Sequence, residues 1–420
     1  MKESLKVASQ PSIRSEPAWL NRNVVGMGLT SLLSDAGHEM ATAILPGFFA
    51  VLGIPAAALG VIEGLADAVS SFVKLGAGWI SDHLGHRKAI AVGGYFLTGV
   101  SKALFAFAYG WPLVLVGRVV GWFGRGVRGP LRDAMLAESV PAEARGKAFG
   151  FHRAADTLGA IIGPALTAGL LAYLQPRASE ASAPFRMIFL LTLIPGLGSA
   201  LAFATLVSDP HGARAPVRFW TAIRDLPVPF RRFLWAVGGF GMGDFAHTLL
   251  ILAATQLLTP QYGVARSAQI AVLLYVLRNV LYAGVSYPVG ALSDRWGRRE
   301  LLIFGYVTGA ATAAGVTVAF LWNIASLPYL VLLFTLAGIY MAVQDALEGA
   351  ITADLVPKGV RGTAYGVLGT VNGVGDFAAS AMVGILWTAV SPAVAFGIAA
   401  TLMMVGAAML SGMRWAGEER

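Results

Sequence analysis

The residues with the clearest chemical potential are acidic side chains inside long apolar stretches. Asp35 and Glu39 stand four positions apart with His38 between them, and Glu63 and Asp67 repeat this spacing in the next apolar stretch. Residues four apart share one face of an α-helix, so each pair would present two carboxylates side by side. A carboxylate among apolar residues must meet a cavity, a cation or a proton, since it is costly to leave charged and alone. We therefore expect proton or substrate binding at these acids.

Further ionisable residues stand inside later apolar stretches. Arg118 is placed to control a proton site or to bind an anion, and the alternative is a static pair, for example with Asp67, that fixes helix register. Three arginines approach the end of the same stretch, where we expect gating pairs with Asp82 and Asp133. They are Arg125, Arg128 and Arg132. The remaining acids predicted to line a proton or substrate cavity are Asp244, Asp345, Glu348 and Asp376.

A metal site is the second hypothesis for these side chains. Oxygen and nitrogen ligands suit a divalent first-row metal such as nickel, cobalt or iron. Hydrogen bonding between helices is the commoner role of a lone histidine in such a setting. The chain has no cysteine, so thiolate ligands and disulfides are excluded. The residues of this alternative are Asp35, His38, Glu39, Asp244 and His247.

Signals of an enzyme are poor. The segment 124–129 has the spacing Gly-x-Gly-x-x-Gly, but it lies inside an apolar stretch with no preceding strand, so it does not indicate a dinucleotide site. No phosphate-binding loop of the Walker type is present, and we expect no cofactor. The simplest coupling ion is a proton, with sodium as the alternative.

The elements that must hold these residues are membrane helices. The chain is 56% hydrophobic and 13% charged, against about 25% charged for a typical soluble domain. A stretch of about 20 apolar residues crosses about 30 Å of hydrocarbon as a helix. We predict an all-α membrane protein with twelve spans, at 24–52, 57–80, 89–109, 112–136, 148–174, 187–207, 233–258, 268–292, 301–322, 327–356, 364–390 and 393–413.

One long polar connection divides these spans into two sets of six. It contains five arginines, and its prolines at 216, 227 and 229 argue against a continuous helix. The segment that begins the chain is polar and has no apolar core next to a cleavage site, so we expect no signal peptide. The predicted parts are a tail at 1–20, a bundle at 21–207, the connection at 208–232, a second bundle at 233–413 and a tail at 414–420.

The two halves repeat each other. The loop motif Gly-x-x-Ser-Asp-x-x-Gly-x-Arg begins at Gly78 and again at Gly290, each time between two apolar spans. The pair Asp35-x-x-His38 in the first span corresponds to Asp244-x-x-His247 in the seventh. Two parallel six-helix repeats are typical of transporters that rock one half against the other.

The basic residues predict the orientation. The loops on one side of the predicted membrane, with the termini, hold most of the lysines and arginines, and the alternate loops hold Arg177, Arg186 and Arg266. By the positive-inside rule both termini are cytoplasmic. The net charge of +8 is therefore assigned to topology rather than to nucleic acid. Lys74 and Lys102 are expected to extend to the membrane surface.

The doubled loop motif, the twelve spans and the central connection resemble the major facilitator superfamily. Arg118 is similar to that family's intramembrane arginine, and Gly159, Gly163 and Pro164 resemble its antiporter signature, although the paired glycines that would follow are missing. Close helix packing is the other role for the two glycines. The resemblance implies a gating role for the loop residues Gly78, Asp82, Gly85, Arg87, Arg128, Asp133, Gly290, Asp294, Gly297 and Arg298.

The hypothesis that follows is proton-coupled export of a small molecule across a bacterial-type cytoplasmic membrane. The coupling proton and the lipid bilayer are the other expected partners, and the resemblance implies a monomer. Efflux of a divalent metal is the alternative. A sensor or scaffold that transports nothing is a further alternative, which the charges inside the spans disfavour because a scaffold has no use for them.

Overall fold

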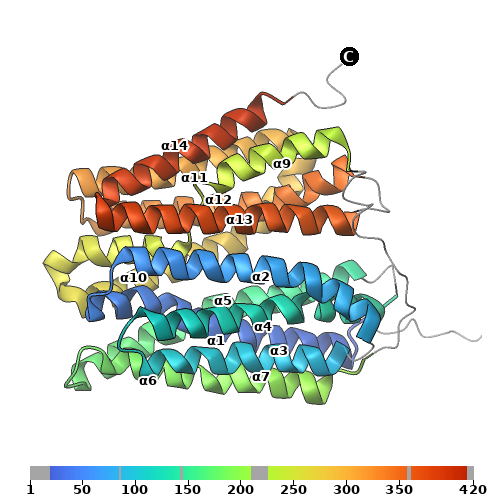
Figure 1. Cartoon of the computed structure of the whole chain (residues 1–420), viewed down its shortest axis with the longest axis horizontal. Coiled ribbons are helices and arrows are strands. Elements are labelled where there is room, and N and C mark those ends of the chain that lie inside the picture. Colours follow the sequence, from blue (N-terminus) through green and yellow to red (C-terminus); the bar gives the residue numbers. More distant parts are fainter. Residues whose placement is uncertain (1–18, 85–86, 142–144, 210–225, 357–360, 414–420) are drawn as a thin grey trace, which may run out of the picture.

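The computed structural model describes residues 19–84, 87–141, 145–209, 226–356 and 361–413, and the regular structure in these ranges is all helical. The helices run side by side in two bundles, the N-terminal one in the lower half of Figure 1 and the C-terminal one in the upper half. We call the end of the bundles that contains Arg22, Leu84 and Glu138 the terminal face. The end that contains Leu52 and Trp111 is the opposite face.

The N-terminal bundle follows the predicted spans closely. Asn21 caps the first helix by accepting a hydrogen bond from the Val24 N–H, and Gly53 ends it in the left-handed conformation (φ 67°). The sixth span begins at Ala183, earlier than predicted, and it bends at Thr192 just before Pro195. The elements are α1 (Arg22–Leu52), α2 (Ala56–Leu84), α3 (Arg87–Ser101), η1 (Lys102–Phe107), α4 (Trp111–Glu138), α5 (Arg145–Leu174), η3 (Gln175–Arg177), α6 (Ala183–Leu191) and α7 (Leu193–Leu206).

The C-terminal bundle contains the remaining predicted spans. Its first helix starts at Val228 rather than at 233, because prolines are tolerated in the first turn, where the N–H has no helical partner. Most of the predicted connection, 210–225, lies outside the described residues. The elements are α9 (Val228–Gly241), α10 (His247–Trp296), α11 (Arg298–Leu321), α12 (Leu327–Leu355), α13 (Arg361–Ala389) and α14 (Pro392–Ser411).

The seventh span is broken, where we predicted a continuous helix. Residues 242–246 between α9 and α10 are not helical, so Asp244 lies in a gap between two half-helices. The preceding segment is rich in glycine, which favours helix poorly, and Gly243 lies directly against the Ala399 carbonyl of α14. Ser380 of α13 accepts a hydrogen bond at 2.9 Å from the Ala246 N–H, which precedes the first turn of α10. Neighbouring helices therefore pack against the gap and satisfy part of its backbone hydrogen bonding.

The seventh and eighth spans run into each other without a polar loop. The chain turns at Gly263, whose φ of 72° and ψ of 162° are outside the helical region. Only glycine adopts such a conformation without strain. Pro260 stands three residues earlier inside the helix, where it removes one helical hydrogen bond. α10 thus consists of the second half of the seventh span and the eighth span, joined by a sharp turn.

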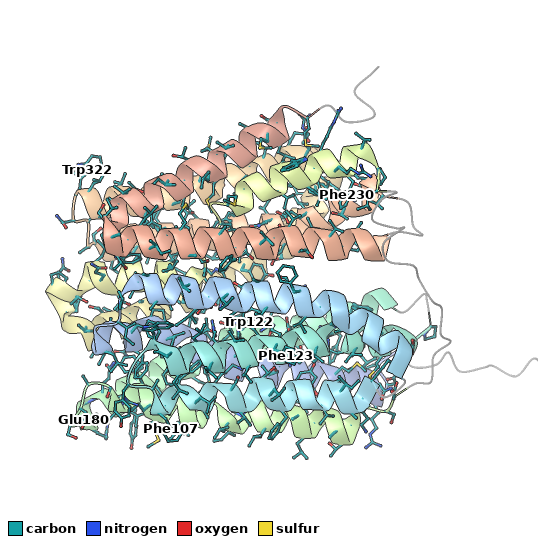
Figure 2. The ribbon with its side chains drawn as sticks, viewed as in Figure 1. Phe107, Trp122, Phe123, Glu180, Phe230 and Trp322 are labelled. Atoms are coloured by element: carbon teal, nitrogen blue, oxygen red, sulfur yellow. The ribbon has the colours of Figure 1, made fainter. Side chains whose placement is uncertain are left out.

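The outer surface of the bundles is apolar. Phe107 and Trp322, 62% and 71% exposed, point outward near the opposite face, which Glu180 also marks in Figure 2. Eight helical stretches of the described residues are long and apolar enough to cross a membrane. A soluble monomer would bury such a surface, and a bilayer solvates it.

The two halves contact each other through small residues and through hydrogen bonds near the opposite face. Gly60 of α2 lies against the Ser380 carbonyl and Gly384 of α13. Hydrogen bonds join the Ala57 N–H to Thr388 (2.9 Å), and Gln175 to the Ala265 carbonyl (2.9 Å). In the parts of the chain that the structure describes, no hydrogen bond between halves is found near the terminal face. The halves are thus held together from the middle to the opposite face.

Candidate functional site

The centre of the N-terminal bundle holds two carboxyl groups in contact. Asp35 of α1 is hydrogen-bonded to Asp156 of α5, a residue that our sequence analysis did not select. Ser31 donates a hydrogen bond to Asp156 at 2.7 Å. Arg125 lies 3.5 Å from Asp35, and Arg153 lies 3.4 Å from Asp156. A hydrogen bond between two carboxyl groups needs a proton between them, so this pair is a place where the protein can hold one.

Close packing of α1 and α5 makes this contact possible. Gly159 lies directly against the Leu32 carbonyl, and Gly163 lies directly against the Ala36 carbonyl. Any side chain at these positions would meet rigid backbone. Asp156 is one turn before Gly159 on the same helix, which brings it beside Asp35. The signal that would have selected Asp156 is its position one turn before the glycine pair.

A buried ion pair lies deeper in the same bundle. Arg118 of α4 forms two short contacts with Glu63 of α2, at 2.7 and 2.8 Å, and donates to Thr42 of α1 at 3.0 Å. Both charged side chains are 3% exposed or less. The static pair of our alternative therefore exists, but its acid is Glu63 and not Asp67. Bidentate geometry and mutual neutralisation are typical of a structural ion pair.

The lysines behave differently from each other. Lys102 is buried, and it donates to the Thr98 carbonyl at 2.7 Å. The prediction that it reaches the membrane surface is wrong, because η1 turns its side chain back along α3. Lys74 is exposed, as expected.

Glu39 connects the two halves. The Tyr275 hydroxyl of α10 donates a hydrogen bond to Glu39 of α1 at 2.8 Å. His247 stacks on the Tyr275 ring with a centroid distance of 5.1 Å. This contact places a titratable acid of the N-terminal half directly on the C-terminal half, at mid-height of the bundles.

The predicted metal ligands do not assemble. No three His, Asp or Glu side chains of the described residues lie close enough to hold a metal ion. His38 packs edge-on against Trp122 at 5.3 Å, while Asp35 faces Asp156 and Arg125. Asp244 lies in the gap of the seventh span, so it does not share a helical face with His247. The metal prediction for Asp35, His38, Glu39, Asp244 and His247 is therefore wrong for this structure.

The acids predicted in the C-terminal half have neutral partners. Tyr340 donates to Asp244 at 3.2 Å, and Tyr282 donates to Asp345 at 2.6 Å. Tyr306 and Asn372 donate to Glu348 at 2.8 and 2.7 Å. Asp376 of α13 is half-buried and lies within electrostatic reach of Asp67, Asp244, Asp345 and Glu348. Across the two halves, the structure places Glu39 against Tyr275 and brings Asp376 within electrostatic reach of Asp67.

The loop motif is described only in part. Arg87 forms ion pairs with Glu138 (2.7 Å) and Asp209 (3.1 Å) at the terminal face. In the second copy Arg298 pairs with Asp354 at 2.6 Å, after Gly297, whose φ is 93°. Gly85 lies outside the described residues, as do the side chains of Asp82 and Asp294 and the surroundings of Gly78, and Gly290 has open space around it.

One of the gating pairs predicted for the α4 arginines is present. Asp133 pairs with its neighbour Arg132 at 2.8 Å. Arg128 lies over the Tyr95 ring at 4.0 Å, and its Nε and Nη1 atoms have no hydrogen-bond partner among the described residues. A gating pair between Arg128 and Asp133 is therefore not formed in this structure.

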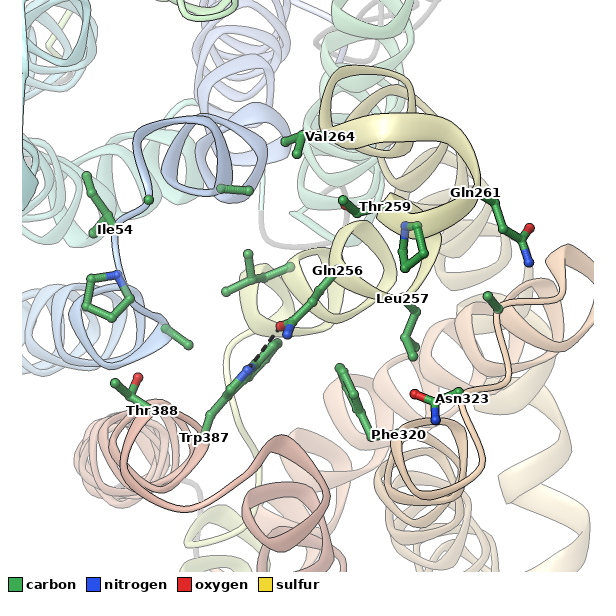
Figure 3. A pocket seen from close by; sticks show the side chains of 17 residues that line it. Ile54, Gln256, Leu257, Thr259, Gln261, Val264, Phe320, Asn323, Trp387 and Thr388 are labelled. Atoms are coloured by element: carbon green, nitrogen blue, oxygen red, sulfur yellow. Dashed lines mark hydrogen bonds between the residues drawn. The ribbon is translucent and has the colours of Figure 1, made fainter.

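A pocket opens between the halves at the opposite face. It has a volume of about 910 Å³ and contains no charged side chain. Trp387 donates to Gln256 at 3.2 Å across it, and Asn323 and Thr388 line its rim (Figure 3). It lies away from the carboxyl pair, next to the hydrogen bonds that join the halves.

Comparisons with known proteins agree with this architecture. The family model described as Major Facilitator Superfamily matches residues 27–275 and 237–419. An uncharacterized MFS-type transporter of Methanocaldococcus jannaschii is 32% identical over 93% of this chain and 94% of its own length. The quinolone resistance protein NorA of Staphylococcus aureus is 24% identical over 46% of each chain.

A solved structure has the same fold. A bacterial homolog of the human lysosomal transporter Spinster, in an inward-facing and unoccupied conformation, superposes with a TM-score of 0.73. The two chains are 14% identical, and the match covers 96% of this chain and 100% of the other. At this level of identity the likeness concerns the fold alone.

Proposed function

The chain belongs to the major facilitator superfamily, and on that premise we propose that it exports a small molecule in exchange for protons by alternating access. The all-α fold of two six-helix bundles and the membrane-spanning surface are those of a transporter and not of an enzyme. The substrate moves through the space between the halves, and the proton uses the acids that face this space.

The observation that carries the proposal is the contact between Asp35 and Asp156. When the shared proton leaves, two negative charges remain side by side in a site with little water. Arg125 and Arg153 offset part of this repulsion, at 3.5 and 3.4 Å. The energy of the site therefore depends strongly on protonation. Because the two acids belong to different helices, loss of the proton pushes α1 and α5 apart.

Export rather than import is supported by two features. Gly159, Gly163 and Pro164 resemble the antiporter signature, and they position the carboxyl pair. The partial likeness to a quinolone resistance protein points in the same direction. We place the chain as a monomer in the cytoplasmic membrane, with both termini and the terminal face in the cytoplasm, because the basic loops lie on that face.

Proton release from the purified protein tests the coupling. The detergent-solubilised protein is placed in weak buffer with a pH indicator, and a quinolone, tetraphenylphosphonium and chloramphenicol are added in turn. We expect at least one probe to release protons from the wild type. Asp35→Asn and Asp156→Asn should each lose this release, because a side-chain amide does not give up a proton near neutral pH. Glu180→Gln, on the exposed opposite face, is the control.

Two results would contradict the proposal. One is proton release that persists in both asparagine variants, which would place the coupling acid elsewhere. The other is the absence of release with every probe. Direction is tested separately, by uptake of the active probe into inside-out vesicles with an acid interior. Accumulation there supports export, and its absence contradicts it.

A further inference from the structure

The two halves provide different partners for the acids inside their spans. In the N-terminal half arginines contact the acids: Arg118 contacts Glu63, Arg125 contacts Asp35 and Arg153 contacts Asp156. In the C-terminal half the partners of Asp244, Asp345 and Glu348 are tyrosine hydroxyls and an amide. Uncharged donors satisfy hydrogen bonds, but they leave the negative charge in place.

The nearest cation of that half is engaged elsewhere. Arg278 is the single Lys or Arg between Arg266 and Arg295 in the sequence. It donates to Asn279 at 2.8 Å and lies over the rings of Tyr275 and Tyr282, each at 5.7 Å. Its field reaches Asp244, but the structure shows no ion pair between them among the described residues. Within the described parts of the chain, Asp244, Asp345 and Glu348 therefore lack a contacting counter-charge.

A buried acceptor atom beside Asp244 is also unsatisfied. Gln344 of α12 is 7% exposed, and its amide hydrogen-bonds the Asp244 carboxylate. The carbonyl oxygen of this amide has no hydrogen-bond partner among the residues that the structure describes. A buried polar atom without a partner is uncommon and costly. Here it lies in the gap of the seventh span, next to a carboxylate that also accepts hydrogen bonds.

The size and chemistry of the missing partner follow from these groups. Two acceptors side by side, one of them negative, call for a positively charged donor with N–H groups. A bare metal ion does not fit, because no three His, Asp or Glu side chains of the described part of the chain converge on one point. Asp376, half-buried between the halves and within electrostatic reach of Asp244, adds attraction for a positive charge.

We propose that Asp244 and Gln344 bind the protonated amino group of an organic substrate. The carboxylate accepts one N–H and carries the counter-charge, and the Gln344 carbonyl accepts a second N–H. Asp376 attracts the charge without contacting it. This inference rests on the proposed function and specifies its substrate class as primary or secondary amines. The N-terminal half would then hold the proton and the C-terminal half the substrate.

Equilibrium binding to the purified protein tests this assignment without any proton gradient. Benzylamine, 2-phenylethylamine and 4-phenylbutylamine are titrated against their matching alcohols, with isothermal calorimetry as the readout. We expect at least one amine to bind more tightly than its alcohol by about ten-fold or more, the usual effect of a charge-assisted hydrogen bond. The N,N,N-trimethyl form of that amine keeps the charge but has no N–H, and it should lose most of this advantage.

Variants assign the residues. Asp244→Asn should weaken amine binding about ten-fold or more, and Gln344→Leu by a smaller factor, with alcohol binding unchanged. Asp376→Asn should weaken it less than Asp244→Asn, and this variant keeps the test valid if Asp244→Asn does not fold. Glu180→Gln, on the exposed opposite face and outside the pocket, is the control and should bind as the wild type does.

The outcomes separate this inference from the proposed function. Equal binding of every amine and its alcohol overturns the amine site, as does unchanged amine affinity in both Asp244→Asn and Asp376→Asn. Amine binding that is intact in Asp35→Asn and Asp156→Asn supports the division between the halves. If amines bind but release no protons from the wild type, the amine site stands and the proton-coupled mechanism fails.

Discussion

At the scale of single residues, the two pairs of the N-terminal bundle contrast in what they do with charge. Arg118 and Glu63 neutralise each other in bidentate geometry, whereas Asp35 and Asp156 concentrate negative charge. The Arg118–Glu63 pair is stable without any change of protonation. The Asp35–Asp156 pair is stable only when a proton lies between its two carboxyl groups. Sequence spacing suggests Glu63 as a proton carrier, but its ion pair with Arg118 is typical of a structural residue. Asp156, which the spacing does not suggest, is the better candidate for a proton carrier.

The ion pair makes a prediction about stability. Glu63→Gln leaves the Arg118 guanidinium buried without a counter-charge, so we expect a loss of about 3–5 kcal/mol in unfolding free energy. A lower midpoint of thermal unfolding in detergent is the measurement. Glu63→Gln combined with Arg118→Gln removes both charges and should recover much of the loss. A double variant no more stable than the single one would show that the charge imbalance is not the cause.

At the scale of elements, small residues decide which helices approach each other. Gly159 and Gly163 bring α5 onto the α1 backbone, and Gly60 and Gly384 bring α2 onto α13. The first contact positions the carboxyl pair within one half, and the second joins the two halves. The glycines of the antiporter-like segment thus have the packing role that we weighed as an alternative, and through it they also serve the proposed proton site.

The α1–α5 contact can be tested with one added methyl group. Gly163→Ala places a Cβ against the Ala36 carbonyl, so α5 must move and the contact between Asp35 and Asp156 is lost. We expect proton release to fall severalfold, although alanine favours helix by about 1 kcal/mol over glycine. Gly169→Ala on the same helix has open space around it and should behave as the wild type or better. Equal behaviour of the two variants would rule out the packing argument.

At the scale of the whole molecule, the halves are hydrogen-bonded from mid-height to the opposite face. The contact between Glu39 and Tyr275 is the innermost of these links that involves a titratable group. Protonation of Glu39 would weaken it, which gives a second route by which a proton could change the relation of the halves. The uncharged pocket lies between this hydrogen bond and the opposite face. A path for the proposed substrate would open there when the two halves rock against each other.

Removal of this link should favour opening at the opposite face. Tyr275→Phe takes one hydrogen bond from the half-buried Glu39, an effect of about 1–3 kcal/mol. Ala268→Cys, at the contact between Gly47 and α10, reports opening through its rate of modification by a membrane-impermeant maleimide. The chain has no native cysteine, so the label is specific. We expect faster labelling in Tyr275→Phe.

The matched control for this experiment is Tyr282→Phe. Tyr282 also donates to a carboxylate, Asp345, but both residues belong to the C-terminal half. Its loss should leave the labelling rate of Ala268→Cys unchanged. Similar acceleration in both tyrosine variants would mean that the effect does not depend on a link between the halves.

Much of the fold could be predicted from the sequence, because a bilayer imposes simple rules. Apolar length sets the spans, and the doubled loop motif shows the duplication; the all-α fold and the family are confirmed. The gap in the seventh span was missed, since hydropathy does not detect a helix break that neighbouring helices satisfy. The division of the chain into tails, bundles and connection remains a prediction.

The sequence by itself determined which residues are costly inside the membrane, and hence where function must be sought. Only the tertiary structure decided their partners: Glu63 rather than Asp67 for Arg118, Asp156 for Asp35, and neutral donors for Asp244 and Glu348. The reason is physical. The cost of a buried charge depends on its own position in the span, which the sequence shows, whereas its compensation depends on groups from other helices, which only packing brings together.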